Sequence, residues 1–338
     1  MLKALRSKYP SSKITLLAYS WVVDLIPCIP DVDEVVISDI PSATSFIKKI
    51  IDAVRLLKQL HAVKPEIVVV GHRNSVFGAL AYLSGARYRL GFTGTRFLTH
   101  TALFNSSAHE VDRYLSILNT IGIEIKNHNT NLTIQEKDLI SLDSKLIANG
   151  IPPKIPLIVI FPGGGENPVV KMTIKRWYLE RFQELIGKIG ESYTYPIILI
   201  GNGADNTLCQ EIASHANQIT NLAGKLTLGE IVALGRRSHL FLGADSGPTH
   251  LIAATGTPVI SLFGPSDPRL VAPRGLHQIY IWKHPVCAPC YTPDTVQQKI
   301  NSLEREFICQ TGTHECMKSL TVDDVWKLIV QQLDQSLI

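Results

Sequence analysis

The stretch Gly243-Ala244-Asp245-Ser246-Gly247-Pro248-Thr249-His250 decides the fold of the second half of the chain. The apolar residues 240–242 before it predict a buried strand, and the apolar residues 251–254 after it predict a short helix that ends at Gly256. Asp, Ser and Thr side chains bond to the unpaired N–H groups at the start of a helix, and proline suits the first helical position. The stretch therefore predicts a sharp polar turn that leads from a strand into a helix.

Two interpretations of this turn stay open. Free N–H groups and the positive end of the helix dipole make the start of such a helix a place where phosphate binds. The turn is equally compatible with an ordinary capped connection in an α/β domain. A second apolar run, residues 258–263, ends in the turn Gly264-Pro265-Ser266-Asp267-Pro268. The order strand, turn, helix, strand, turn is typical of one half of a ligand-binding crevice.

Composition places the chain among globular, core-forming proteins. Its 338 residues suffice for about two domains, and 45% of them are hydrophobic while 18% are charged. The net charge of +4 shows no strong nucleic-acid footprint, so we expect no nucleic acid as a partner. Because no apolar run reaches transmembrane length and no signal peptide is readable, we expect a cytoplasmic protein. Basic residues form either a solvated surface or a face toward an anionic membrane, at Lys3, Arg6, Lys8, Lys13 and in the region 87–96.

Both halves of the chain alternate strand and helix patterns. Capping boxes of Ser107 with Glu110 and of Thr227 with Glu230 predict two helix starts. Polar residues at 126–131 and the Gly/Pro-rich stretch 150–156 break regular structure, so we expect a boundary within 127–155 and domains of 1–150 and 151–338. Apolar runs predict strands at 14–18, 35–37, 67–70, 88–92, 157–161 and 197–200, with a helix at 46–61. The predicted fold class is α/β, with two doubly wound, Rossmann-like domains that face a cleft.

Further residues of the second half point to an anionic ligand. Gly163 and Gly164 end a predicted strand, where they let a backbone approach a ligand or form a plain flexible turn. Lys175 stands at a helix entrance, where a cation opposes the helix dipole. That placement favours either a bound anion or a solvated basic surface with Trp177 packed inside. Asp205 follows the next strand, where a carboxylate accepts bonds from ribose hydroxyls or caps the following helix.

Four of the six cysteines gather near the end of the chain, at Cys287, Cys290, Cys309 and Cys316. A Cys-x-x-Cys pair with two later cysteines is the outline of a structural zinc site. The spacing of the last two cysteines is wider than in the usual zinc knuckle, so packing thiols and a disulfide are alternatives. His284 and His314 are further candidate ligands or packing side chains.

Four strand ends in the second half thus present glycine, hydroxyl, lysine or carboxylate groups, as an open sheet does when it binds a nucleotide. With these motifs the chain resembles glycosyltransferase family 9, the heptosyltransferase family of lipopolysaccharide assembly. The resemblance covers nearly the whole chain. The matching segments are residues 162–164, 175–177 with Phe182, 221–225, 245–250, 262–268, 109–114 and 316–317.

The resemblance implies a GT-B fold and an inverting transfer of a heptose-like sugar from a nucleotide-diphosphate donor, such as ADP-heptose, to lipopolysaccharide or another glycan. It implies that Lys175 and the turn from Asp245 to His250 hold the donor pyrophosphate, with Gly163 and Gly164 close to the donor and Asp205 on the ribose. A lysine and a helix start would stabilise the leaving diphosphate, so no cofactor is required. The acceptor would lie against the first domain, with peripheral contact to the inner membrane; candidate contacts are Arg87, Arg89 and Arg96.

One departure from the family concerns the start of the sequence. Family members begin with an apolar strand and a Gly-Asp turn, whose aspartate is the expected general base. This sequence opens with Met1-Leu2-Lys3-Ala4-Leu5-Arg6, which resembles the later part of the first helix, so we assign no catalytic base. Either the natural protein starts upstream of Met1, or the chain is a shortened, catalytically inactive relative that still binds nucleotide-sugar. An NAD-type oxidoreductase is disfavoured because no Gly-x-Gly-x-x-Gly follows a strand.

Overall fold

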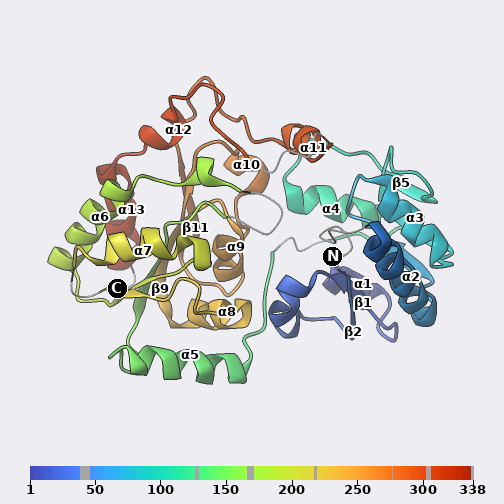
Figure 1. Ribbon diagram of the computed structural model, residues 1–338, viewed down its shortest axis with the longest axis horizontal. Coiled ribbons are helices and arrows are strands. Elements are labelled where there is room, and N and C mark those ends of the chain that lie inside the picture. The colour runs from blue at the N-terminus through green and yellow to red at the C-terminus, as the bar shows by residue number, and fades with distance from the viewer. Residues whose placement is uncertain are drawn as a thin grey trace. The chain divides into compact units, whose positions relative to one another are not determined.

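Parallel strands and helices make up both parts of the chain, so the predicted α/β fold class is confirmed (Figure 1). The computed structural model describes residues 1–38, 46–125, 129–165, 171–216, 219–275, 277–301 and 306–335. Contacts divide the chain into a first unit, Met1–His128, and a second unit, Asn129–Ile338.

A six-stranded parallel sheet forms the middle of the second unit, in the order β11-β10-β9-β6-β7-β8. Chain order runs outward from β6 to β8 on one side and from β9 to β11 on the other, so it reverses between β6 and β9. In such doubly wound sheets, ligands bind beyond the carboxyl ends of the strands at the point of reversal. The strands are β6 (Leu157–Phe161), β7 (Ile197–Leu199), β8 (Ile219–Asn221), β9 (Ser238–Ala244), β10 (Val259–Phe263) and β11 (Gln278–Trp282).

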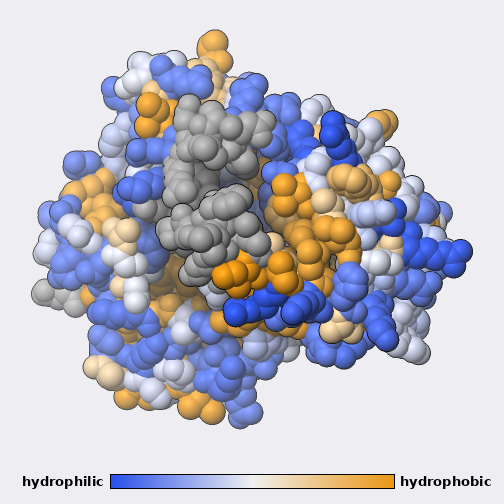
Figure 2. All heavy atoms as spheres, turned by 45° about the vertical axis from the view of Figure 1, so that its right-hand side comes forward, coloured by the Kyte–Doolittle hydropathy of each residue, from blue (hydrophilic) through white to orange (hydrophobic). Residues whose placement is uncertain are grey.

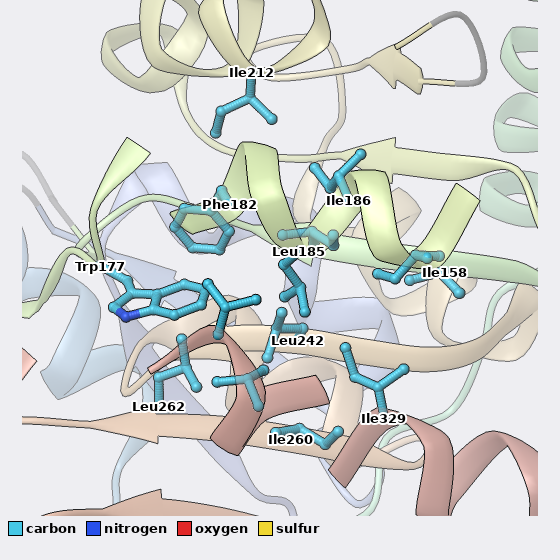
Figure 3. Packing of buried hydrophobic residues seen from close by; sticks show 14 of the residues in the cluster. Ile158, Trp177, Phe182, Leu185, Ile186, Ile212, Leu242, Ile260, Leu262 and Ile329 are labelled. Carbon is cyan, nitrogen blue, oxygen red and sulfur yellow. The ribbon is translucent and has the colours of Figure 1, made fainter. Parts of the chain in front are cut away.

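Hydrophobic side chains cover both faces of this sheet, which is why its central strands are apolar without interruption. On one face Ile158 and Leu242 belong to a core with side chains of α6 (Leu179–Ser192) and α13 (Val322–Gln335) (Figure 3). On the other face Val159 packs with side chains of α5 (Glu136–Ala148), α8 (Leu228–Arg237) and α9 (Gly247–Ala253). The remaining helices of this unit are η3 (Thr173–Lys175) and η4 (Gly203–Asp205), both of the 3-10 type, and α7 (Asn206–Ala213), α10 (Pro268–Val271), α11 (Pro293–Asn301) and α12 (Glu315–Lys318).

Helix α5 belongs to the second unit, so the division of the chain lies after residue 128, inside the predicted boundary range 127–155 but before the predicted limit at residue 150. Leu142 and Leu146 of α5 are buried in the core that contains β6 and α8. Ser141 Oγ donates to Glu230 Oε1 of α8 at 2.7 Å, and Lys145 Nζ lies 2.7 Å from the same oxygen. A Gly/Pro-rich stretch marks where a helix ends, whereas packing decides which unit the helix joins. Of the predicted polar stretch 126–131, residues 126–128 lie outside the described residues.

The first unit has two parallel sheets, which share no strand pair among the described residues. β1 (Thr15–Ala18) pairs with β2 (Glu34–Ile37), and β4 (Tyr88–Phe92) lies between β3 (Ile67–Val69) and β5 (His100–Ala102). The sequence pattern does not predict β5, because three residues with a single apolar one carry no periodicity. The helices of this unit are α1 (Leu2–Lys8), the 3-10 helix η1 (Ser20–Cys28), α2 (Phe46–Val63), α3 (Ser75–Leu83) and α4 (Glu110–Asn119). None of the described helices is long and apolar enough to cross a membrane.

The two predicted capping boxes have different outcomes. At the start of α8 the side chains of Thr227 and Glu230 each accept the other's main-chain N–H, so this prediction is confirmed. At the start of α4 the cap is His109, whose Nδ1 accepts the N–H of Val111, so the predicted box of Ser107 with Glu110 is wrong. An imidazole with an unprotonated nitrogen supplies the acceptor that the pattern assigns to a hydroxyl.

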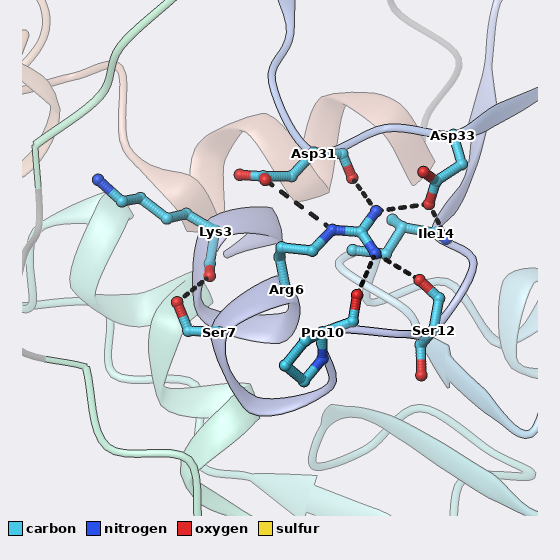
Figure 4. A network of polar contacts seen from close by, with 8 residues as sticks. All are labelled: Lys3, Arg6, Ser7, Pro10, Ser12, Ile14, Asp31 and Asp33. Carbon is cyan, nitrogen blue, oxygen red and sulfur yellow. Dashed lines mark hydrogen bonds and ion pairs between the residues drawn. The ribbon is translucent and has the colours of Figure 1, made fainter.

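Arg6 fastens α1 to the sheet of β1 and β2 (Figure 4). Its guanidinium donates to the main-chain oxygens of Pro10 and Ser12, and to Asp33 Oδ2 at 2.5 Å. Asp33 also accepts the N–H of Ile14. This bond and, to a smaller extent, the bond from Arg6 hold the pKa of the exposed Asp33 carboxyl below its usual value. Arg6 therefore has a structural task at the start of the first unit.

Replacing Leu142 by alanine tests the assignment of α5 to the second unit. The Leu142 side chain is fully buried, so we expect the free energy of unfolding to fall by about 2–5 kcal/mol. Ile140 of the same helix is 60% exposed, and Ile140→Ala should change that free energy by no more than about 0.5 kcal/mol. Urea unfolding followed by tryptophan fluorescence in a Trp21→Phe background reports on the second unit, which contains Trp177, Trp282 and Trp326. Equal effects of the two variants would contradict the assignment.

Candidate functional site

Loops from several strands converge at the carboxyl edge of the six-stranded sheet, on both sides of the point where strand order reverses. Gly163 and Gly164 follow β6, Asp205 ends η4 just after β7, and Asp245 follows β9 directly. Lys175 ends η3, in the connection from β6 to α6. We call the part of the second unit formed by these residues and the turn 264–267 after β10 the donor edge, after the sugar donor that the family resemblance predicts there.

An ion pair between Lys175 and Asp245 lies at the centre of the donor edge. Lys175 Nζ donates to Asp245 Oδ2 at 2.7 Å and to the Asp245 main-chain oxygen at 3.2 Å. Only 9% of each side chain is exposed. The structure thus brings the predicted lysine into direct contact with the predicted turn, although 70 residues separate them in sequence.

The Asp245 carboxylate is held in its charged form by groups from three loops. Burial by itself would raise the pKa of Asp245, but Lys175, His250 and Ser266 together lower it well below its usual range. The Ser266 hydroxyl donates to Oδ2 at 2.6 Å, and His250 Nε2 lies 3.6 Å from Oδ1. Asp245 is therefore the counter-ion that fixes the Lys175 ammonium, rather than a group that meets a phosphate itself.

The turn from Asp245 to His250 divides into residues that shape it and residues that face solvent. The Ser246 and Thr249 hydroxyls lie 2.9 Å apart, and Thr249 Oγ1 also donates to the main-chain oxygen of Ala244. Both side chains are buried, so they fasten the turn from within. Gly247 and His250 are exposed and Pro248, in the first turn of α9 as predicted, is half-buried. Of the six predicted residues, these three are the most exposed.

Asp205 serves as the helix cap that the sequence allows as an alternative to ribose binding. Its Oδ2 accepts the N–H of Asn202 at 3.1 Å, and Asn202 in turn caps η4, which completes a capping box. Its Oδ1 accepts a bond from Arg176 Nη2 at 2.9 Å. With both oxygens bonded and 1% of the residue exposed, Asp205 does not offer a free carboxylate to a ribose hydroxyl. The sequence analysis misses the role of Arg176, for which its position beside Lys175 is the available signal.

Gly163 and Gly164 are required by close contacts within the protein. A Cβ atom at Gly163 would lie 2.7 Å from both Asp205 carboxylate oxygens, and one at Gly164 would lie 2.0 Å from the main-chain oxygen of Met172. The glycines therefore let the loop after β6 pass beside η4 and the residues before η3. The structure shows a reason for them other than the predicted approach of a ligand.

The four late cysteines lie in one region without forming a metal centre. Among the residues that the structure describes, no group of three or more His, Cys, Asp or Glu side chains is arranged to hold a metal ion, so the zinc site stays a prediction without geometric support. All six cysteines are free thiols, so the alternative disulfide is not formed. Burial raises the pKa of Cys316 to about 11 and also raises that of Cys290, while a bond from the Thr311 hydroxyl lowers that of Cys309. Cys287 is exposed.

Asp245→Asn tests the buried ion pair through its pH dependence. The variant leaves the Lys175 ammonium buried without a counter-charge, so we expect the free energy of unfolding at pH 7 to fall by about 3–5 kcal/mol. The folded-state pKa of Asp245 lies below the unfolded value of about 3.9. The stabilisation by the carboxylate is therefore present above that pH and is lost as the pH falls below it. Urea unfolding from pH 7 to pH 3 should show the difference between the two proteins begin to narrow below about pH 4, because the unfolded carboxyl takes up its proton before the folded one does. A difference that stays constant down to pH 3 would contradict the role of the charge.

Comparisons with known proteins identify the family of the chain. The model of glycosyltransferase family 9 (heptosyltransferase) matches residues 53–301. Lipopolysaccharide heptosyltransferase 3 of Escherichia coli (strain K12) is 28% identical over 293 residues, which cover 83% of this chain and 82% of that protein.

Two solved structures share the fold. The structure of E. coli ADP-heptose lps heptosyltransferase II has a TM-score of 0.76 at 20% identity and covers 100% of this chain and 94% of its own. The structure of E. coli heptosyltransferase WaaC with ADP has a TM-score of 0.67 at 18% identity and covers 89% of this chain and 93% of its own. The predicted GT-B type of fold is confirmed. Since the family model matches well over half of the sequence, the chain belongs to glycosyltransferase family 9 (heptosyltransferase).

Proposed function

We propose that this glycosyltransferase moves a heptose-like sugar from an ADP-sugar donor to a lipopolysaccharide or related glycan acceptor, with inversion at the anomeric carbon. The family and the names of the similar proteins support the sugar and the acceptor, and a similar structure contains ADP. The observation that carries the proposal is the buried Lys175 ammonium, which Asp245 fixes at the sheet edge where doubly wound domains bind nucleotides.

The proposed reaction needs a fixed positive charge beside the departing diphosphate. An acceptor hydroxyl attacks the anomeric carbon from the face opposite the diphosphate, a new C–O bond forms, and the bond from carbon to the phosphate oxygen breaks. The hydroxyl proton passes to a general base, which we do not assign. The diphosphate gains negative charge as it leaves, and a pre-fixed ammonium stabilises that charge without reorganising.

The contacts of Lys175 suggest how it meets the donor. Its shorter bond, at 2.7 Å, goes to the Asp245 carboxylate, and the longer one, at 3.2 Å, goes to the Asp245 main-chain oxygen. A phosphate oxygen would take the place of the longer bond, while the carboxylate keeps the ammonium in position. His250 is exposed beside the same carboxylate, and its ring is a second group that could donate a hydrogen bond to the diphosphate. In this proposal Asp205 supports the loop after β7 instead of binding ribose.

Removing both charges of the central pair tests the donor site. We expect Lys175→Met/Asp245→Asn to weaken ADP binding by ten- to a hundredfold, because a charged hydrogen bond contributes about 1.5–3 kcal/mol. Lys175→Ala alone is a poorer test, because it leaves Asp245 buried without its counter-ion. The matched control is Lys188→Met/Asp323→Asn, an ion pair of the same type and the same 2.7 Å separation in which Asp323 is exposed. Titration calorimetry with ADP measures the effect, and equal affinity of the pair variant and the wild type would refute the site.

A transfer assay separates an active enzyme from an inactive relative that still binds donor. With ADP-heptose and a lipopolysaccharide core acceptor, the active chain produces glycosylated acceptor of opposite anomeric configuration to the donor. ADP binding without turnover, by a chain that is fully folded, would favour the inactive relative.

The first unit carries a surface that suits an anionic membrane, where a glycolipid acceptor would lie. Residues 67–109 contain four arginines and no Asp or Glu. Tyr82 and Phe97 in this region are exposed and their ring centroids lie 5.8 Å apart, while the Arg89 guanidinium lies over the Tyr82 ring. Figure 2 shows exposed hydrophobic residues in orange. Within residues 67–109 the exposed large side chains of this kind are Val76, Tyr82, Leu83, Phe97 and Leu103.

Aromatic and aliphatic side chains among arginines match the interface of a bilayer that contains acidic lipids. Arg89 donates to the main-chain oxygens of Phe97 and Ala86, so it shapes this surface, whereas Arg87 and Arg96 are exposed. We infer that the peripheral contact with the membrane uses this face of the first unit.

Charge reversal at Arg87 and Arg96 tests the membrane contact. Each basic residue near an anionic surface contributes about 1 kcal/mol, so Arg87→Glu/Arg96→Glu should weaken binding to phosphatidylglycerol-containing vesicles at least about thirtyfold. The matched control is Arg55→Glu/Lys58→Glu, which changes two exposed cations of α2 in the same unit. Co-sedimentation with these vesicles and with purely zwitterionic ones is the measurement. Equal losses in both double variants would show that net charge alone matters and that the face is not specific.

A further inference from the structure

The Lys175 ammonium has an aromatic partner as well as a carboxylate. Its Nζ lies 4.2 Å from the centroid of the Tyr291 ring. The ring face of an aromatic side chain attracts a cation, and the attraction is stronger where water is excluded. Lys175 is therefore held by two kinds of partner, Asp245 by charge and Tyr291 by the ring.

Tyr291 is anchored to the same turn that supplies a partner to Asp245. The N–H groups of Cys290 and Tyr291 both donate to the main-chain oxygen of Pro265, at 3.0 and 2.9 Å. Ser266, the next residue of that turn, forms a parallel bridge with Tyr291 and donates its hydroxyl to Asp245. A single turn after β10 thus fixes the ring above Lys175 and the hydroxyl beside Asp245.

The same late segment of the chain also holds the backbone that leads to Lys175. His314 Nε2 donates to the main-chain oxygen of Ile174 at 2.6 Å, and the N–H of His314 donates to Cys309 Sγ at 3.3 Å. Phe307 donates its N–H to the main-chain oxygen of Lys171, and its ring lies edge-on to Tyr291 with centroids 5.0 Å apart. Cys290 and Cys309 pack against the small core of Met172, Ile174 and Phe307.

Through these contacts the described part of the cysteine-bearing segment 287–316 supports Lys175 and the backbone that leads to it. A lysine side chain is long and flexible, and a buried carboxylate alone fixes one end of it without fixing its direction. We propose that Tyr291 is a positioning residue, whose ring directs the Lys175 ammonium toward the donor diphosphate. This inference rests on the proposed function of the donor edge and deepens it, because it gives a residue outside the predicted donor contacts an effect on donor binding.

The ring itself, and not merely a residue of similar size, is expected to matter. Tyr291→Leu removes the aromatic face and keeps an apolar side chain, whereas Tyr291→Phe keeps the face. We expect Tyr291→Leu to raise the KM for the ADP-sugar and the Kd for ADP by about three- to thirtyfold, with the KM for the acceptor unchanged. Tyr291→Phe should change the KM for the ADP-sugar and the Kd for ADP by no more than about twofold from the wild type. Tyr195→Leu is the matched control, since Tyr195 contacts other rings in the second unit and not the donor edge.

A measurement that needs no donor keeps this inference separate from the proposed function. Competitive acetylation with acetic anhydride, read by mass spectrometry, reports how accessible each lysine is. Lys175 of the wild type is shielded, with 9% of its side chain exposed, and it should react several-fold faster in Tyr291→Leu but not in Tyr291→Phe. Unchanged acetylation of Lys175 in Tyr291→Leu, or equal effects of Leu and Phe, would overturn the positioning role. If Lys175 is released as expected but the wild type binds no ADP, the proposed function fails instead.

Discussion

The ammonium of Lys175 and the carboxylate of Asp245 lie 2.7 Å apart in a place that water scarcely reaches. Taking two charges out of water is costly, and their attraction offsets the cost only when geometry is good and the remaining donors and acceptors are satisfied. Here the satisfying groups come from separate loops: Ser266 after β10, and His250 after β9. A shift of any of these loops would leave a buried charge poorly paired, so the pair links the loops at the carboxyl edge of the sheet.

The loops of the donor edge are consequently built from side chains that bind one another. Ser246 and Thr249 fasten the turn after β9, and Asp205 caps η4. A Cβ atom at Gly163 would come within 2.7 Å of the Asp205 carboxylate, so a glycine is needed there. Such a site is pre-organised, which suits a ligand whose charge increases during the reaction. Many of the residues in the matching motifs thus contact one another and shape the edge.

The packing of the four late cysteines differs from that of a metal site. Their spacing outlines a metal site but is equally compatible with packing thiols or a disulfide, and Cys290 and Cys309 pack against the small core that contains Phe307. Their environment is partly apolar, and burial raises the pKa of Cys290 and Cys316, so these two thiols stay protonated at neutral pH. Cys309 also accepts the N–H of His314, whose ring donates to the main-chain oxygen of Ile174, the residue before Lys175.

The sequence by itself determined the features that depend on near neighbours along the chain. The apolar runs of β6 and β10, the capping box of Thr227 with Glu230, and the turn before α9 are all set by periodicity and capping within a few residues. The motifs also sufficed for the family. Three features could be found only in the folded structure. Helix α5 joins the second unit, and the Tyr291 ring lies over the Lys175 ammonium. Both carboxylate oxygens of Asp205 are already bonded, one to Arg176 and one to the N–H group of Asn202. These contacts join residues that are far apart in the chain, or they depend on which face of a helix is buried. The local spacing of residues carries no information about which loops meet at the edge of a folded sheet.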